Sequence, residues 1–277
     1  MLKRLARFVL ALIVCAYIAL IVLALKSDSL IFQPHSSSYS DASLSASVSK
    51  ATPRSTAPTP QIAHFNSDIE TITAVYLPNP AARHTILFSH GNAEDIADEL
   101  PFLNEFVNAG FSVFAYDYRG FGTSTGKPTE KGSYEDADAA YDYLTTQLHV
   151  PGNRVISMGR SLGCAMAIHL AANRPVAALV VEAPFLSAFR VLTHIQMLPW
   201  DKFNNAREIR KVHVPVLIIH GRADQVVPFW HGERLYALAN QPKTFMPVDG
   251  AGHNDVILLA GHKYLVALQT FAAIPER

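Results

Sequence analysis

The sequence predicts an α/β fold in which a mostly parallel sheet carries helices on both of its faces. Along residues 64–277, short runs that are apolar throughout alternate with longer segments of helical spacing, as expected of parallel strands buried on both sides. A serine between two glycines joins one such run to an alanine-rich helix. Polar side chains directly follow other runs, at the strand ends where parallel sheets gather their reactive groups.

Residues 1–26 contain an apolar run, residues 8–25, that is preceded by Lys3, Arg4 and Arg7. As a helix this run would be roughly 27 Å long, close to the thickness of a bilayer core. The positive charges before it favour a cytoplasmic N-terminus and an extracytoplasmic domain, which would be periplasmic in a bacterium. A cleavable signal peptide is the alternative, but its apolar region is usually shorter and no clear Ala-x-Ala site follows. We therefore expect a cytoplasmic stub and a transmembrane signal anchor.

Residues 27–63 are dominated by Ser, Ala, Thr and Pro. A segment of this composition buries too little apolar surface to offset the entropy cost of ordering it. We expect a linker here, followed by one well-buried domain over residues 64–277.

Charge and cysteine content exclude several classes of protein. The formal net charge is +0 and no basic cluster follows the N-terminus, which argues against a nucleic-acid partner. The chain has two cysteines, Cys15 in the apolar run and Cys164 in the domain, so no disulfide framework is expected. No His-Glu-x-x-His or other metal-ligand spacing occurs, and we expect neither a metal nor a cofactor.

Apolar and β-branched runs predict the strands of the domain. In chain order they are residues 70–77, 85–89, 111–116, 154–158, 178–182, 216–220 and 244–246. Helical spacing between them predicts helices over residues 96–107, 133–148, 164–173 and 233–239, and a further helix at the C-terminus.

The segment Gly159-Arg-Ser-Leu-Gly163 must turn a strand sharply into a helix. Such a turn crowds the backbone, so glycine is needed on either side of its apex. The apex residue, Ser161, is then held in a strained conformation with its side chain exposed above the sheet. The motif alone is weak and also fits a surface loop, but its place between strand and helix indicates a nucleophile.

A serine hydroxyl needs a base to take its proton, and the base needs a carboxylate to orient it. Asp224 and His253 each follow a predicted strand, and they come after Ser161 in the order acid, then histidine, which is typical of such elbows. Glu182 is a weaker alternative for the acid. Asp249 and Asp255 are too close to His253 in sequence to reach its far ring nitrogen easily.

The negative oxygen that forms during acyl transfer needs preorganised hydrogen-bond donors. We expect one from the backbone N–H of Leu162, at the positive start of the helix. The second should come from the loop after the strand of residues 85–89, where Asn92 is the predicted donor.

Five motifs in the same order resemble those of the α/β-hydrolase superfamily over residues 64–277. They are His90-Gly-Asn-Ala93, Asp117-x-Arg-Gly-x-Gly-x-Ser124, Gly159-x-Ser-x-Gly163, His220-Gly-x-x-Asp224-x-x-Val-Pro228 and Gly252-His253-Asn-Asp255. Within the superfamily the chain is most similar to a small membrane-anchored group with little or no cap, which is related to protein depalmitoylases and serine-aminopeptidase-like hydrolases.

The resemblance implies an α/β-hydrolase fold with a minimal cap. It implies Ser161 as the nucleophile, Asp224 and His253 as its partners, and Asn92 and Leu162 as the oxyanion hole.

The connection over residues 184–215 is too short for a lid domain and is rich in bulky apolar residues. Phe185, Leu192 and Trp200 could form an open wall for an acyl chain, or they could simply pack this segment onto the core. We expect a serine hydrolase that cleaves esters or thioesters, with a lipid or an acylated protein as the substrate. A peptidase is not favoured, because no acidic cluster suggests a pocket for an amino terminus. A non-catalytic binding protein is the other alternative.

Overall fold

The computed structural model describes residues 2–51, 60–195 and 201–272. At its centre lies an eight-stranded sheet of order β1-β2-β4-β3-β5-β6-β7-β8. The strands are β1 (Gln61–Ser67), β2 (Glu70–Leu77), β3 (Thr85–Ser89), β4 (Ser112–Tyr116), β5 (Val155–Arg160), β6 (Ala178–Glu182), β7 (Val216–Gly221) and β8 (Lys243–Val248).

The sheet is mostly parallel, as predicted. β1 and β2 pair in antiparallel fashion, and β2 is antiparallel to β4. All strands from β3 to β8 run parallel. β3 to β7 are buried along nearly their whole length, which explains why their sequences are apolar throughout and do not alternate. The seven predicted strands are all present. β1 was not predicted, since the region before residue 64 was assigned to the linker.

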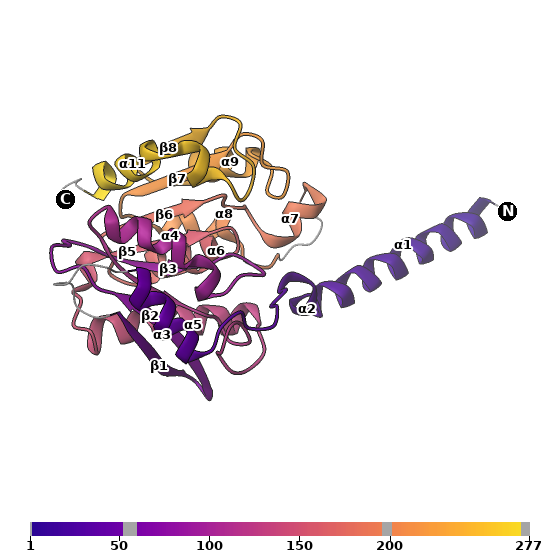
Figure 1. The fold of residues 1–277 in the computed structure, drawn as a ribbon. Helices are drawn as coiled ribbons and strands as arrows, with labels where there is room; N and C mark the ends of the chain where they lie inside the picture. Colours follow the sequence, from indigo (N-terminus) through magenta and orange to yellow (C-terminus); the bar gives the residue numbers. More distant parts are fainter. Residues whose placement is uncertain (1, 52–59, 196–200, 273–277) are drawn as a thin grey trace.

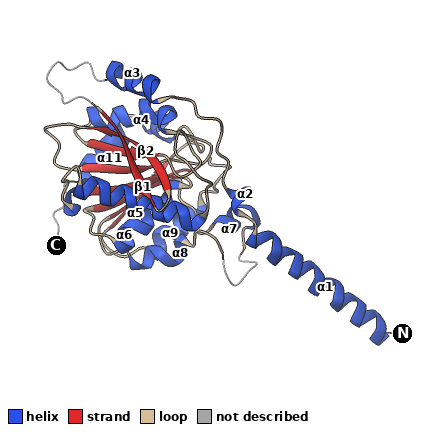
Figure 2. Ribbon diagram, turned by 90° about the horizontal axis from the view of Figure 1, so that it is seen from below, coloured by secondary structure: helices blue, strands red, loops and turns tan. Residues whose placement is uncertain are grey.

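Helices cover both faces of the sheet (Figure 2). α4 (Ile96–Asn108) and α11 (His262–Ala272) pack in one hydrophobic cluster, and α5 (Glu130–Thr146), α6 (Gly163–Asn173) and α9 (Trp230–Leu238) pack in the other. Shorter elements complete the chain: α7 (Ala188–Thr193), α8 (Asn205–Glu208), α10 (Val256–Ala260) and the 3-10 turns Gly152–Arg154 and Ile209–Lys211. The predicted α/β fold with two covered faces is therefore confirmed.

The N-terminal helix α1 (Leu2–Leu25) projects away from the rest of the chain (Figure 1). Among the residues that the structure describes, we find no helix whose length and apolar character would let it cross a membrane. The predicted transmembrane anchor is therefore not supported.

The structure differs from the predicted linker, because residues 28–44 dock onto the domain. This segment, which we call the N-terminal strap, contains α2 (Asp28–Ile31) and the start of α3 (Asp41–Ala51). Phe32 is 4% exposed and packs edge-on against Phe121 and Phe203, with ring centroids 6.3 and 5.7 Å away. Tyr39 and Leu44 are also buried, in the second cluster. A few large apolar side chains in a serine-rich stretch are thus sufficient to hold it on the core.

The strap also supplies hydrogen bonds to buried carboxylates. The Ser38 N–H and Oγ–H donate to the two oxygens of Asp95, at 2.8 and 2.6 Å, and Asp95 caps the start of α4. The Tyr39 hydroxyl donates to Asp117, whose side chain is fully buried. Burial raises the pKa of Asp117 to about 8, against the opposing effect of the Tyr39 hydrogen bond. Removing the strap would take these hydrogen bonds from two buried carboxyl groups, which would keep only their backbone donors in α4.

We predict that Phe32→Ala lowers the free energy of unfolding by about 3–5 kcal/mol, because it removes a buried aromatic ring and leaves a cavity. Leu30→Ala is the matched control, since Leu30 lies in the same strap but is 59% exposed. Its effect should stay within about 0.5 kcal/mol. Urea unfolding of the full chain measures both, and equal midpoints for the two variants would mean that the strap does not dock.

Candidate active site

Ser161 sits at the apex of the turn between β5 and α6 with a φ angle of +50°, in the region that side chains rarely adopt. The two flanking glycines are required by close approach of the backbone. A Cβ on Gly159 would collide with the Gly163 carbonyl, and a Cβ on Gly163 would collide with the Ser89 carbonyl. The Ser161 N–H donates to the Glu182 carbonyl of the neighbouring strand at 2.9 Å. This crowding fixes the position of the serine, as the sequence predicted.

The structure brings Ser161, His253 and Asp224 together from three loops at the carboxyl ends of parallel strands. His253 Nε2 lies 3.0 Å from Ser161 Oγ, and His253 Nδ1 lies 2.8 Å from Asp224 Oδ2. The histidine ring is therefore within hydrogen-bond reach of the hydroxyl on one side and of the carboxylate on the other. This is the geometry in which a histidine can take a proton from a serine.

Asp224 is held as a carboxylate by several donors. Its Oδ1 accepts hydrogen bonds from the Val226 and Val227 N–H groups at 2.9 and 2.8 Å. Burial alone would raise the pKa of Asp224, but hydrogen bonds from His220 and His253 outweigh it and hold that pKa well below its usual value. The carboxylate of Asp224 is therefore negatively charged near neutral pH and can accept a hydrogen bond from His253 Nδ1.

His220 has a place near the site that sequence reasoning did not give it. Its Nε2 lies 2.9 Å from the Val227 carbonyl and 3.4 Å from Asp224 Oδ2, and its side chain is fully buried. Its position four residues before Asp224 was the available signal.

The other acids considered for the triad have different partners. Glu182 is buried and accepts a hydrogen bond from the Tyr264 hydroxyl at 2.6 Å. Asp249 is exposed and pairs with Arg222, and Asp255 accepts from the Gly252 N–H at 2.6 Å. Of the candidates, the structure places only Asp224 against the histidine.

Asn92 lies in the loop after β3, and Leu162 lies in the elbow itself, directly after Ser161. The amide side chain of Asn92 is held by the strap, since its Nδ2 donates to the Ile31 carbonyl and its Oδ1 accepts from the Gln33 N–H. This engagement favours its backbone N–H as the donor that the residue offers to the site. Within the described part of the chain, neither the Asn92 nor the Leu162 N–H donates to another protein group.

The three predicted substrate-binding residues have different outcomes. Phe185 is 4% exposed and belongs to the hydrophobic core, as the packing interpretation of this segment requires. Leu192 lies in α7, but its side chain is not among those that the structure describes. Trp200 lies outside the described residues.

Sequence reasoning missed a largely buried group of charged side chains beside the elbow. Arg160, the residue before the nucleophile, pairs through Nη2 with Glu94, and the same atom lies 3.1 Å from Glu99 Oε1. Glu99 is almost fully buried, and burial raises its pKa to about 9 despite the nearby Arg160. Burial also opposes ionisation of Glu94, but Glu99 and Arg160 together lower its pKa. Near neutral pH the two carboxyl groups therefore keep one proton between them, and burial favours its place on Glu99.

His35, Asp95 and Asp98 form one group whose potential metal-ligating atoms lie within 4.8 Å of one another. These atoms already have partners. His35 Nε2 lies 3.0 Å from Asp98, and Asp95 accepts hydrogen bonds from Ser38 and from the start of α4. The group therefore serves to attach the strap to α4.

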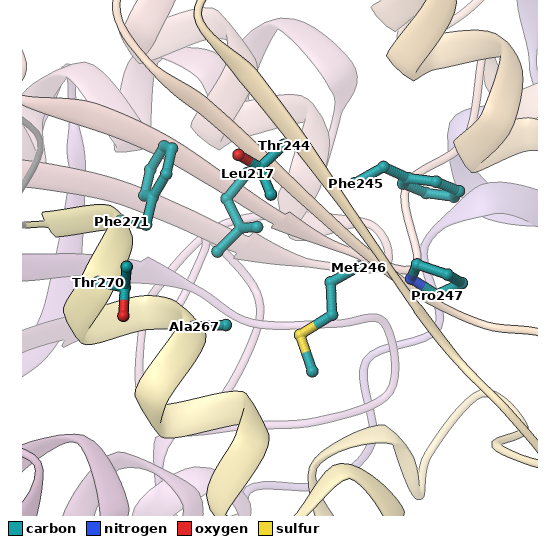
Figure 3. Close-up of a pocket in the computed structure, with 8 residues that line it drawn as sticks. All are labelled: Leu217, Thr244, Phe245, Met246, Pro247, Ala267, Thr270 and Phe271. Carbon is teal, nitrogen blue, oxygen red and sulfur yellow. The ribbon is translucent and has the colours of Figure 1, made fainter.

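A cavity of about 430 Å³ lies elsewhere, between the edge strand β8 and α11 (Figure 3). It contains none of the predicted site residues and no titratable side chain. Its lining consists of Leu217, Thr244, Phe245, Met246, Pro247, Ala267, Thr270 and Phe271. The reactive groups therefore lie at the elbow and not in this cavity.

Similar proteins include hydrolases of the same architecture. A sequence profile of a family described as serine aminopeptidase, S33, matches residues 80–204. Alpha/beta hydrolase domain-containing protein aho-3 of Caenorhabditis elegans is 40% identical over 200 residues, which cover 70% of this chain and 59% of that protein. Alpha/beta hydrolase domain-containing protein 17B of Homo sapiens is also 40% identical over 200 residues, which cover 70% of this chain and 68% of the relative.

Two solved structures share the fold. An esterase from Pyrococcus furiosus aligns with a TM-score of 0.69 at 17% identity, covering 87% of this chain and 97% of the esterase. A membrane phospholipase A, described as a bacterial virulence factor, aligns with a TM-score of 0.62 at 18% identity, covering 96% of this chain and 97% of the phospholipase. At such low identity these likenesses concern the architecture alone.

We predict that Glu99→Gln stabilises the protein more at pH 8 than at pH 5. Burial raises the pKa of Glu99 to about 9 in the folded state from its ordinary value of 4.5, so the folded state keeps a proton that the unfolded state releases. The contribution of this group to stability therefore falls as the pH rises between these two values. Glutamine imitates the protonated form without this cost.

Urea midpoints of the wild type and the variant at the two pH values measure this effect. Glu135→Gln is the control, because its pKa is lowered by Lys131 and the group is ionised in both states across this range. A difference between wild type and Glu99→Gln that does not grow with pH would contradict the protonated assignment.

Proposed function

We propose that this protein is a serine hydrolase that cleaves carboxylic esters or thioesters. The chain belongs to the α/β-hydrolase family that includes the alpha/beta hydrolase domain-containing proteins aho-3 and 17B. The observation that carries the proposal is the position of His253, which lies 3.0 Å from Ser161 and 2.8 Å from Asp224. A fold of this kind hosts many functions, so the argument rests on this site and not on the architecture.

In the first half of the reaction, Ser161 Oγ attacks the carbonyl carbon of the substrate while His253 Nε2 takes the hydroxyl proton. Asp224 stabilises the resulting imidazolium through Nδ1–H. The carbonyl oxygen becomes an oxyanion that accepts hydrogen bonds from the backbone N–H groups of Asn92 and Leu162. Collapse of this intermediate breaks the bond to the alcohol or thiol, which leaves with the proton from His253.

In the second half, water replaces the leaving group. His253 takes a proton from the water as its oxygen attacks the acyl-enzyme carbonyl, and the same two donors stabilise the second oxyanion. Release of the carboxylic acid returns the proton to Ser161. No metal or cofactor takes part in these steps.

The function is tested by labelling with a fluorophosphonate, which reacts covalently with an activated serine. We expect labelling of the wild type, loss of labelling in Ser161→Ala, and normal labelling in Ser29→Ala, a control at an exposed serine. Ser161→Ala and His253→Ala should each lower kcat by about 10⁴-fold or more, and the double variant little further, because the two groups act as a unit. A wild type that neither labels nor hydrolyses esters would point to a non-catalytic binding protein.

A serine aminopeptidase is the alternative that the matched family profile suggests. Such an enzyme needs a carboxylate to bind the amino terminus of its substrate. The carboxyl groups near the elbow, Glu94, Glu99 and Glu182, are directed instead to Arg160 and Tyr264. We therefore favour ester and thioester substrates, with a lipid or an acylated protein as the source of the acyl group.

We predict that kcat/KM on p-nitrophenyl esters rises from acetate to medium chains and then levels off. Each methylene that an open apolar wall can cover contributes about 0.8 kcal/mol. Ile195 is 65% exposed directly after His194, whose ring lies 6.2 Å from that of Trp230, so it lies on the segment expected to form this wall.

Ile195→Asp should flatten the rise and leave acetate hydrolysis unchanged, since it alters binding of the chain and not the chemistry. Ile69→Asp is the matched control, because Ile69 is 87% exposed in the turn between β1 and β2. A wild-type profile that is highest at acetate would contradict the acyl wall and favour packing alone.

A further inference from the structure

One carboxylate connects the two backbone segments that carry the oxyanion donors. Glu94 Oε2 accepts a hydrogen bond from the Gly91 N–H at 3.0 Å, and Glu94 Oε1 pairs with Arg160 Nη2. Gly91 immediately precedes Asn92, and Arg160 stands two residues before Leu162. A single side chain therefore joins the loop after β3 to the elbow after β5.

We propose that Glu94 and Arg160 are positioning residues that set the spacing of the Asn92 and Leu162 donors. The proposal rests on the serine hydrolase function argued above and deepens it. Neither residue touches the reacting atoms in this mechanism; both act through the backbone segments to which they are attached.

The bridge is sheltered from solvent and held on several sides. The side chains of Arg160 and Glu94 are 15% and 21% exposed, so the pair is screened less than a surface ion pair. The Arg160 guanidinium also lies 5.8 Å from the centroid of the Phe102 ring, a contact that restrains its plane. Since Glu94 and Glu99 keep one proton between them near neutral pH, the pair carries one negative charge, which balances the positive charge of Arg160.

The loop that the bridge restrains is strained. Ala93, between Asn92 and Glu94, has a φ angle of +58°, a conformation that is unfavourable for any residue with a Cβ. Strained backbone persists only where its surroundings hold it. Glutamine has only one acceptor oxygen, so without the Glu94 carboxylate the side chain cannot serve both the Gly91 N–H and Arg160. The link is then broken, and the loop is free to relax away from the elbow. Because an oxyanion donor acts only at hydrogen-bond distance from the developing charge, a small shift would weaken it.

The test compares Glu94→Gln with Glu99→Gln. Both remove a carboxyl group that contacts Arg160, but only Glu94 contacts the loop. We expect Glu94→Gln to lower kcat on p-nitrophenyl acetate by about 10- to 100-fold, up to the loss seen when one oxyanion donor is removed. KM should change by less than about threefold, since the donors act mainly in the transition state. Glu99→Gln should keep the wild-type kcat.

A second measurement separates positioning from a general loss of structure. The affinity for a trifluoromethyl ketone, which forms a tetrahedral adduct with the serine, should fall in Glu94→Gln by about the same factor as kcat. Arg160→Met should give the same pattern, and adding it to Glu94→Gln should lower kcat little further. Arg160→Lys, which keeps the charge, should restore part of the kcat that Arg160→Met loses.

The outcomes distinguish the bridge from the function on which it rests. A wild type without ester hydrolysis or fluorophosphonate labelling overturns the proposed function. An active wild type with unchanged kcat and inhibitor affinity in Glu94→Gln overturns the bridge alone. Equal losses in Glu94→Gln and Glu99→Gln also overturn it, because they would reflect the charge cluster and not the loop. If Glu94→Gln does not fold, Arg160→Met decides: a wild-type kcat overturns the bridge, and a lower kcat at unchanged KM supports it.

Discussion

The close approach of backbone at the strand–helix turn is the constraint on which the site depends. Because the chain at Gly159 and Gly163 passes against neighbouring carbonyls, no side chain fits there, and Ser161 is held at a positive φ angle. The same turn sets the Leu162 N–H at the start of α6, where the helix dipole favours negative charge. The proposed nucleophile and the proposed oxyanion donor are thus both positioned by the packing of this one turn, and the parallel sheet brings His253 and Asp224 to the same edge.

Burial has opposite consequences for two carboxyl groups in this molecule. Asp224 is buried but receives hydrogen bonds from two histidines and from backbone N–H groups, so the charged form is favoured. Glu99 is buried with fewer donors and beside Glu94, so its neutral form is favoured near neutral pH. The number of donors around each group, and not its exposure, decides which state it adopts. As a result, the carboxyl groups beside Arg160 present one negative charge to its guanidinium, and Asp224 presents one to His253.

Sequence patterns predicted the parts of the fold that repeat along the chain. The apolar strands, the elbow and the positions of Asp224 and His253 each depend on neighbours within a few residues, and local pattern reports them well. The strap did not follow this rule. Phe32, Tyr39 and Leu44 are isolated among serines without periodicity, and their burial depends on partners such as Phe121 and Phe203 far along the chain. The Glu94–Arg160 pair was missed for the same reason. The two residues are 66 positions apart in the sequence, and no local pattern shows that they are in contact.

The strap links the stability of the domain to the geometry of its site. Asn92 uses its side chain to hold the Ile31 carbonyl and the Gln33 N–H, while its backbone N–H is the proposed oxyanion donor. Farther along the strap, Tyr39 donates to Asp117, which also accepts from the Ile96 N–H at 2.9 Å and lies 3.4 Å from His90 Nε2. The strap therefore contacts Asn92 directly and reaches His90 through Asp117. Since an oxyanion hole is effective only when its donors are already in place, the strap is best regarded as part of the catalytic domain.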